Sequence, residues 1–444
     1  MQRRYRQLVV AHLSPNHRVA SGLQLPASVK RPFSTAQAAW RFFSNERVSL
    51  SQLADPLIQC AREDIPEVCD NWLLVAMDWS SLHFGHHASK MDRVQLAHSR
   101  DWGYDLLTAL AIGDRDGSPI APLCLELRAE EGVYSTRSEH PLDPISVLDS
   151  LEPVMAHVDA LGLDRSPVFI IDRQADSVGH YRTWDSQKRK FLIRADNERL
   201  VLHDGMEVQL STVVTRLKRR QAFSRAGTVL FKGRKATQFV AETEVVLHRP
   251  ARTHRVDPRT GVARHKNVPG PPLRLRFVVS EVRDDRHRVL GRWLLLTNLP
   301  GSVPSATAAL WYYWRWRIES YHKLLKGAGQ QVECWQQSSA ETFSRRLLVA
   351  AMSAVIVYRL ARDDHPEAAE LRDVLVRLSG RQMKRGRHAR SFTEPALLAG
   401  LGVLLPMLDY LSQHSISELQ HMVHAALQGL LPNPTDKNSL ADDG

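Results

Sequence analysis

The sequence predicts an α/β protein built around a mixed β-sheet, and three features lead to this fold class. Short apolar runs separated by turn residues follow one another between residues 71 and 204. Segments with apolar residues every three or four positions, as in amphipathic helices, lie between the later runs. The chain has 444 residues, 43% of them hydrophobic, which is enough for a sizeable core.

The first region, residues 1–70, is expected to be helical. Ser34 and Gln37 form a capping box ahead of an apolar stretch that ends at Phe43. A second helix is predicted from Ser49 to Arg62, with Pro56 bending it or marking its start. This region is either a small DNA-binding unit or a helical cap on the core.

The first part of the core, residues 71–204, begins with three successive strands. The predicted strands are Leu73–Met77, Tyr104–Ile112, Ile120–Leu127, Val168–Ile171 and Lys190–Ala195, with a turn at Gly113–Gly117 and a helix at Ile145–Ala160. A further helix precedes the last strand. The order βββαβαβ is the pattern of a ribonuclease H-like fold.

The remaining chain is predicted to contain three regions. Residues 205–300 form a basic β-rich insertion, with strands at Thr228–Lys232, Thr237–His248, Leu273–Val282 and Trp293–Thr297 and a loop at Arg249–Pro272. Residues 301–365 form the second part of the core and include a buried helix at Thr342–Arg362. Residues 366–444 form a helical C-terminal region with a disordered tail after residue 432.

Basic residues are concentrated in the insertion. The whole chain has a net charge of +11, whereas residues 205–300 hold 20 Lys and Arg against 7 Asp and Glu, a balance of 20 − 7 = +13. Such a segment favours a polyanion partner, most simply nucleic acid, over a basic protein without one. No apolar run is long enough to span a bilayer, and the four cysteines show no CxxC spacing, so we expect a cytoplasmic protein without a membrane partner.

Three carboxylates are candidates for a metal site. Asp78 and Asp172 each follow an apolar run that predicts a strand, and Glu319 lies on a predicted helix. A carboxylate at the end of a buried strand is costly unless it is paired or bound to a metal, although it can also cap the next turn. Together the three would suit two Mg²⁺ ions of a phosphodiester-cleaving site.

A helix over residues 312–326 would place a tyrosine, two cations and a carboxylate on one stripe. Tyr312, Arg315, Glu319 and Lys326 fall within ~60° of one another at 100° per residue. The opposite face holds the apolar residues Trp314, Ile318, Tyr321, Leu324 and Leu325. We expect the apolar face to pack on the core and the other stripe to face outward.

The spacing Tyr312-x2-Arg315-x3-Glu319-x6-Lys326 resembles the YREK signature of DDE transposases of the insertion-sequence-four family. Residues 172–176, Asp-Arg-Gln-Ala-Asp, resemble the block around that family's second catalytic aspartate. Residues 293–297 and 326–329 also fit, and the similarity spans about residues 36–365. Gln174 stands where the family usually has Glu, and Trp79 follows Asp78 in place of a small hydroxyl residue.

The resemblance implies cut-and-paste DNA transposition through a hairpin intermediate in a bacterial, nucleoid-associated enzyme. Asp78, Asp172 and Glu319 would be the catalytic residues and would hold two Mg²⁺ ions, for which Mn²⁺ would substitute. The implied DNA contacts are Tyr312, Arg315 and Lys326 with Lys323 to phosphates, and Trp293 and Trp316 to an unstacked base. The implied partners are double-stranded DNA, as terminal inverted repeats and target, and a second copy in a paired-end complex.

Two other functions remain open from the sequence. One is a two-metal nuclease without strand transfer, and the other is a catalytically silent DNA-binding protein derived from a transposase. A C-terminal helix, with a capping box formed by Ser415 and Glu418 and an apolar stripe from Leu419 to Leu430, is predicted either to form the dimer contact or to pack on the protein's own core.

Overall fold

A computed structural model of the chain describes residues 2, 5, 8, 9, 32–256, 263–327, 329–381 and 392–426. Its helices are α2 (Pro32–Phe43), α3 (Leu50–Val68), α4 (Leu151–Ala160), α5 (Val178–Ser186), α6 (Leu210–Arg219), α7 (Ser305–Trp314), α8 (Trp316–Leu325), α9 (Ala340–Arg362), α10 (Pro366–Leu378), α11 (Glu394–Leu411) and α12 (Ile416–Ala426). Two 3₁₀ turns, η1 (Arg173–Ala175) and η2 (Val332–Cys334), are also present. The basic N-terminal residues before Pro32 and the predicted tail after residue 432 lie almost wholly outside the described residues.

The first nine strands are β1 (Trp72–His83), β2 (Val94–Gln95), β3 (Trp102–Gly113), β4 (Pro119–Ala129), β5 (Gly132–Ser135), β6 (Ser166–Ile171), β7 (Lys190–Arg194), β8 (Leu200–His203) and β9 (Met206–Gln209). The others are β10 (Ser224–Phe231), β11 (Arg234–Leu247), β12 (Ala251–Val256), β13 (Ala263–Val268), β14 (Leu273–Arg283) and β15 (Val289–Thr297). Thirteen of the described strands form one mixed sheet. Eleven follow the path β5-β4-β3-β1-β6-β7-β15-β14-β11-β8-β9, while β10 pairs with β11 and β2 with β3 beside this path.

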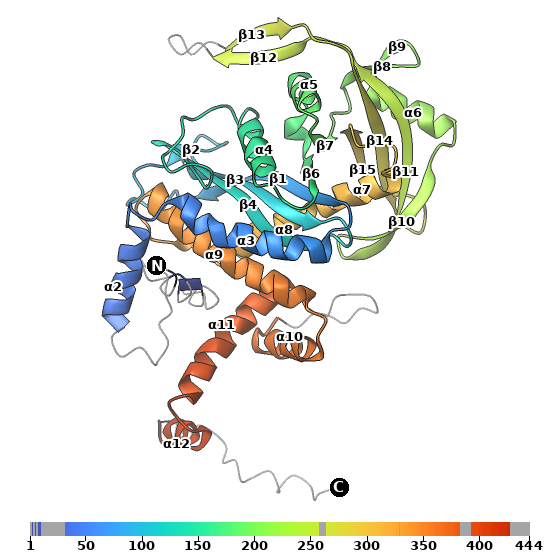
Figure 1. The fold of residues 1–444 in the computed structure, drawn as a ribbon. Helices are drawn as coiled ribbons and strands as arrows, with labels where there is room; N and C mark the ends of the chain where they lie inside the picture. The colour runs from blue at the N-terminus through green and yellow to red at the C-terminus, as the bar shows by residue number, and fades with distance from the viewer. Residues whose placement is uncertain are drawn as a thin grey trace, which may run out of the picture.

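The N-terminal half of this sheet is compatible with the predicted ribonuclease H-like core. β3 pairs antiparallel with β1 and β4, while β6 pairs parallel with β1 and β7. Figure 1 shows α4 and α5 on one side of the sheet and α3, α8 and α9 on the other. Residues 73–77 are fully buried because helices cover both faces, which explains why their sequence is continuously apolar instead of alternating.

Strand β1 is longer than its apolar run predicted. It continues to His83, and its antiparallel register with β3 extends to the pair His83↔Gly103. Backbone pairing therefore persists after the side chains cease to be apolar, because the ladder needs only main-chain groups. Asp78 consequently lies inside the strand and not at its end, contrary to the prediction.

Strands from the predicted insertion continue the core sheet. β15 pairs antiparallel with β7 through Leu295↔Arg194, and β14 and β11 follow outward from it. The prediction of a loop at residues 249–272 was wrong, because β12 and β13 pair there over six positions as a separate hairpin. A ribbon held by backbone hydrogen bonds need not show an apolar alternation, which was the signal used for strands.

Two predicted helix starts also differ from the structure. Helix α2 begins at Pro32, so Ser34 lies in its first turn and not at the N-cap position. Helix α4 begins at Leu151, because Ser146 and Asp149 bond to each other in a turn ahead of it. The helix predicted from Ser49 to Arg62 is present as α3, with Ser49 as its N-cap, and it runs through Pro56 to Val68.

The C-terminal helices extend away from the sheet (Figure 1). The predicted buried helix is confirmed as α9, with 15 buried residues among its 23. The predicted capping box is also present: Ser415 Oγ accepts from Glu418 N at 3.2 Å, and Glu418 Oε2 accepts from Ser415 N at 2.7 Å. None of the helices in the described part of the chain is long and apolar enough to cross a membrane.

Candidate active site

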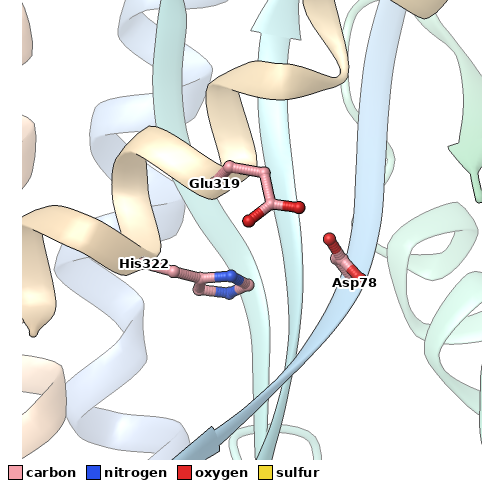
Figure 2. A group of neighbouring side chains, drawn as sticks. All are labelled: Asp78, Glu319 and His322. Atoms are coloured by element: carbon pink, nitrogen blue, oxygen red, sulfur yellow. The ribbon is translucent and has the colours of Figure 1, made fainter.

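Strand β1 and helix α8 bring two of the predicted carboxylates together. Asp78, Glu319 and His322 each offer a donor atom, and these three atoms lie within 4.8 Å of one another. Figure 2 shows Glu319 and His322 on neighbouring turns of α8, with Asp78 on the strand facing them. Glu319 and His322 share a helix face because residues three apart are neighbours there.

The helix that carries the motif is interrupted where the sequence predicted it to be continuous. Helix α7 ends at Trp314 and α8 starts at Trp316, with Arg315 between them in a right-handed conformation (φ −47°, ψ −31°). The Arg315 N–H is shared between the Trp311 and Tyr312 carbonyls. Lys326 follows the end of α8 with φ −82° and ψ −139°, so it does not belong to the same helical stripe.

Arg315 points at the carboxylates and not at solvent. Its Nη1 donates to Asp78 Oδ2 at 2.9 Å, and its Nη2 lies 3.7 Å from Glu319 Oε1. Arg315 and Tyr312 are both buried, at 8% and 5% exposure. The prediction of an outward-facing stripe was therefore wrong: α7 and α8 turn this stripe toward β1, and the guanidinium compensates the buried carboxylate charge.

Asp78 is strongly affected by these surroundings. Burial raises its pKa to about 6; the Arg315 charge and hydrogen bond oppose this shift, while Glu319 and Asp172 add to it. The backbone N–H of Trp79 donates to Asp78 Oδ1 at 2.9 Å, so both carboxylate oxygens are oriented. A carboxylate with a raised pKa among other acids is typical of a site that gains from a bound cation.

Asp172 directly follows β6, as predicted. Its side chain caps η1 by accepting from Gln174 N at 2.8 Å, and its charge contributes to the raised pKa of Asp78. It is not one of the three residues whose donors lie within 4.8 Å. Asp176 holds this turn in place: its side chain accepts from Asp196 N at 2.8 Å and from Arg199 Nε at 3.0 Å.

His322 was not predicted as a site residue. Burial lowers its pKa to about 3, assisted by the charges of Lys326 and Arg315, so the imidazole is neutral. Its Nε2 lies 3.3 Å from Thr108 Oγ1 on β3. The sequence signal for it was the Glu319-x2-His322 spacing, which places two potential ligands on one helix face.

Other predicted DNA contacts lie around this group. Trp316 is 57% exposed, with Lys323 Nζ 5.8 Å from its ring centroid. Trp293 is half-buried, 6.1 Å from the Phe231 ring and 6.4 Å from Tyr312, so it also packs within the protein. Lys326 Nζ donates to Ser81 O at 2.5 Å at the end of β1.

Arg194 is a second residue that the sequence did not single out. It ends β7 and is half-exposed. Burial raises the pKa of Tyr312, while the charges of Arg315 and Arg194 lower it, which places Arg194 in the same electrostatic environment. Only the pairing of β7 with β6 and β15 brings this cation near the motif, so no local pattern indicated it.

No protein-family model matches the chain, and no curated protein matches it. Among solved structures, a cryo-EM structure of the piggyBac transposase synaptic complex with hairpin DNA has a TM-score of 0.36 and 9% identity. That match covers 97% of this chain and 76% of the other. A TM-score this low does not establish a shared fold.

Proposed function

We propose that this protein is a DNA transposase of the DDE type, which cuts and joins phosphodiester bonds with two divalent metal ions. The observation that carries the proposal is the meeting of Asp78 and Glu319, from β1 and α8, beside a buried arginine. Asp172 at the end of β6 supplies the third carboxylate, and its charge acts on Asp78. A set of acids on separate elements, with cations beside it, suits metal-assisted chemistry on a phosphate backbone.

The donor set fits a divalent ion. Asp78 and Glu319 provide the carboxylate oxygens that Mg²⁺ prefers, and Asp172 can add a third. Arg315 only partly offsets the free-energy cost of burying the Asp78 charge, so a cation bound beside Asp78 would reduce that cost. When bound, two ions would activate the attacking oxygen and stabilise the leaving oxygen.

The surrounding side chains would bind and orient the DNA. Arg315 and Lys326 would contact backbone phosphates, with Tyr312 donating its hydroxyl, and Arg194 adds positive charge on the same side. Arginine suits this role because its planar group can bond two phosphate oxygens at once. Because Arg315 now contacts Asp78, binding phosphate would require it to exchange partners.

The proposed reaction starts with hydrolysis. A water oxygen attacks the phosphorus at the element's end, the P–O3′ bond breaks, and a 3′-hydroxyl is released. That hydroxyl attacks a phosphorus of the opposite strand, which forms the hairpin and breaks the P–O3′ bond to the flanking DNA, whose 3′-hydroxyl leaves. A second water attacks the hairpin phosphorus and breaks its P–O3′ bond, which restores the 3′-hydroxyl of the element. This hydroxyl finally attacks a phosphorus of target DNA, and the 3′-oxygen of the cut target strand leaves. Hairpin formation requires a sharp bend, and the exposed Trp316 ring offers a stacking surface for a base that leaves the duplex.

The proposal is tested with purified protein, Mg²⁺ and a linear fragment that carries the flanking ends of the protein's own gene. We expect nicked and hairpin-ended products from the wild type, and none from Asp78→Asn or Glu319→Gln, which should still bind the fragment. Asp364→Asn changes an exposed carboxylate at the α9–α10 junction and serves as the matched control, with unchanged products.

The products also separate this function from its alternatives. Nicks and double-strand breaks without hairpins or joined products would indicate a nuclease. Binding without any cleavage, at equal affinity in all variants, would indicate a silent DNA-binding protein. Cleavage by Glu319→Gln at the wild-type rate would remove Glu319 from the catalytic group.

A further inference from the structure

His322 lies beside the two carboxylates, in a position that a three-carboxylate site does not explain. We propose that His322 is a ligand of the metal ion held by Asp78 and Glu319, giving this ion a nitrogen donor. This inference rests on the proposed function, because it concerns the same metal site, and it adds a residue and a metal preference to it.

The geometry supports a shared ion. The three donor atoms already lie within 4.8 Å of one another (Figure 2). Opposite ligands of an octahedral ion with bonds of about 2.1 Å lie about 4.2 Å apart. At most one of the three pairs can be opposite, and adjacent ligands lie about 3.0 Å apart. A contraction of no more than about 1.8 Å between any two donor atoms would therefore bring Asp78, Glu319 and His322 into one coordination sphere, a movement that side-chain rotation can provide.

The surroundings of His322 hold its ring in place. The residue is 5% exposed, and its Nε2 lies 3.3 Å from Thr108 Oγ1, which leaves Nδ1 as the nitrogen that can face an ion. Thr108 is the cross-strand partner of Asp78, so one pair of the β1–β3 ladder supplies both a ligand and the group that orients another ligand. Ring nitrogens that bind metals usually have such a partner on their second nitrogen.

A nitrogen ligand would change the metal preference. Carboxylates and water suit Mg²⁺ and Mn²⁺ alike, whereas imidazole favours transition metals over Mg²⁺. We therefore expect Mn²⁺ to bind at least tenfold more tightly than Mg²⁺, and the His322→Gln variant to lose most of that difference by binding Mn²⁺ more weakly. Mg²⁺ affinity should change less in the same variant.

Pulsed electron paramagnetic resonance on the full-length protein with Mn²⁺ alone tests this directly. Bound Mn²⁺ should show coupling to a ¹⁴N nucleus, and the coupling should change to that of ¹⁵N when only histidine is ¹⁵N-labelled. The labelled wild type answers the question even if a variant does not fold. His322→Gln should lose the coupling, while His157→Gln, a half-buried histidine on α4, should keep it.

Each outcome has a separate meaning. Nitrogen coupling that depends on His322 supports the proposal. Mn²⁺ that binds in an Asp78-dependent manner without nitrogen coupling overturns His322 as a ligand and leaves the carboxylate site standing. No Asp78-dependent Mn²⁺ binding overturns both this inference and the metal chemistry of the proposed function.

Discussion

Arg315 Nη1 donates a hydrogen bond to Asp78 Oδ2 at 2.9 Å, joining two residues 237 positions apart in the chain. The guanidinium also lies 3.7 Å from Glu319 Oε1. In the metal-free protein, Arg315 thus acts as the counter-ion of carboxylates that we propose bind metal. Burial nevertheless outweighs this pairing, because the pKa of Asp78 is still raised to about 6.

Replacing Asp78 by Asn should stabilise the metal-free protein at neutral pH. The folded protein retains the Asp78 proton between its ordinary pKa of 3.8 and about 6, where the unfolded chain loses it, so this carboxyl lowers stability as pH rises through that window. We expect a gain of about 2 kcal/mol in the free energy of unfolding at pH 7 for Asp78→Asn. Urea unfolding without metal at pH 4 and pH 7 measures it, with Asp364→Asn as control; a variant less stable than wild type at pH 7 contradicts the prediction.

The two candidate stacking residues should behave differently. Trp316 is exposed, so Trp316→Ala should remove about 1 to 3 kcal/mol of base stacking and thereby reduce the hairpin yield. The melting temperature of the protein should not fall. Trp293 packs on Phe231 and Tyr312, so Trp293→Ala should lower both the hairpin yield and the melting temperature. Trp40→Ala, at a similarly exposed tryptophan on α2, is the control. If Trp316→Ala reduces nicking as much as hairpin formation, Trp316 does not act in base stacking.

Glu281 should stabilise the insertion. Its buried carboxylate lies within 3.0 Å of cationic groups on Lys218, Arg283 and Arg292. Burial alone would raise its pKa, but hydrogen bonds from these three cations outweigh it and lower the pKa. Because the folded pKa lies below the ordinary value of 4.5, this stabilisation is present at neutral pH and is lost as pH falls below about 4.5.

The Glu281→Gln variant should lose about 3 kcal/mol at pH 7, because it leaves three cations without their shared anion. Glu244→Gln is the matched control, since Glu244 lies 3.8 Å from Arg274 with both side chains more than 70% exposed. Thermal unfolding at pH 7 and pH 4 compares the two variants. Equal stability of both at pH 7 would show that the buried cluster adds nothing.

The C-terminal helices should mediate dimerisation. Within the described residues, α11 and α12 expose the large apolar side chains Val403, Met407, Leu408, Tyr410, Leu411, Ile416 and Met422. Leu408→Glu with Met422→Glu should abolish paired-end complexes in a gel-shift assay while single-end binding persists, because charges would be buried in the contact. Gln420→Glu on α12 is the control. Paired-end complexes at wild-type yield in the double variant would place the contact elsewhere.

Local patterns of the sequence determined much of the fold. The apolar runs within β1, β3, β4, β6 and β7 predicted these strands, because segments covered on both faces are largely apolar. The capping box of Ser415 and Glu418 was also predicted, since it involves residues only three apart. Hairpin β12–β13 was not predicted, because it is held by backbone pairing and shows no side-chain periodicity.

The residues of the candidate site also fall into those that the sequence predicted and those that only the structure identified. The sequence by itself singled out Asp78 and Asp172, because each carboxylate follows an apolar run, and Glu319, because of its spacing from Tyr312, Arg315 and Lys326. Only the tertiary structure decided that Arg315 faces Asp78, that His322 and Thr108 join the group, and that Arg194 approaches Tyr312. These relationships depend on the packing of α8 against β1 and of β7 beside β15, which bring together residues far apart in the chain. Contacts between such distant residues leave no periodic pattern in the sequence, so the acids of the site could be predicted from it, whereas the groups that surround them could not.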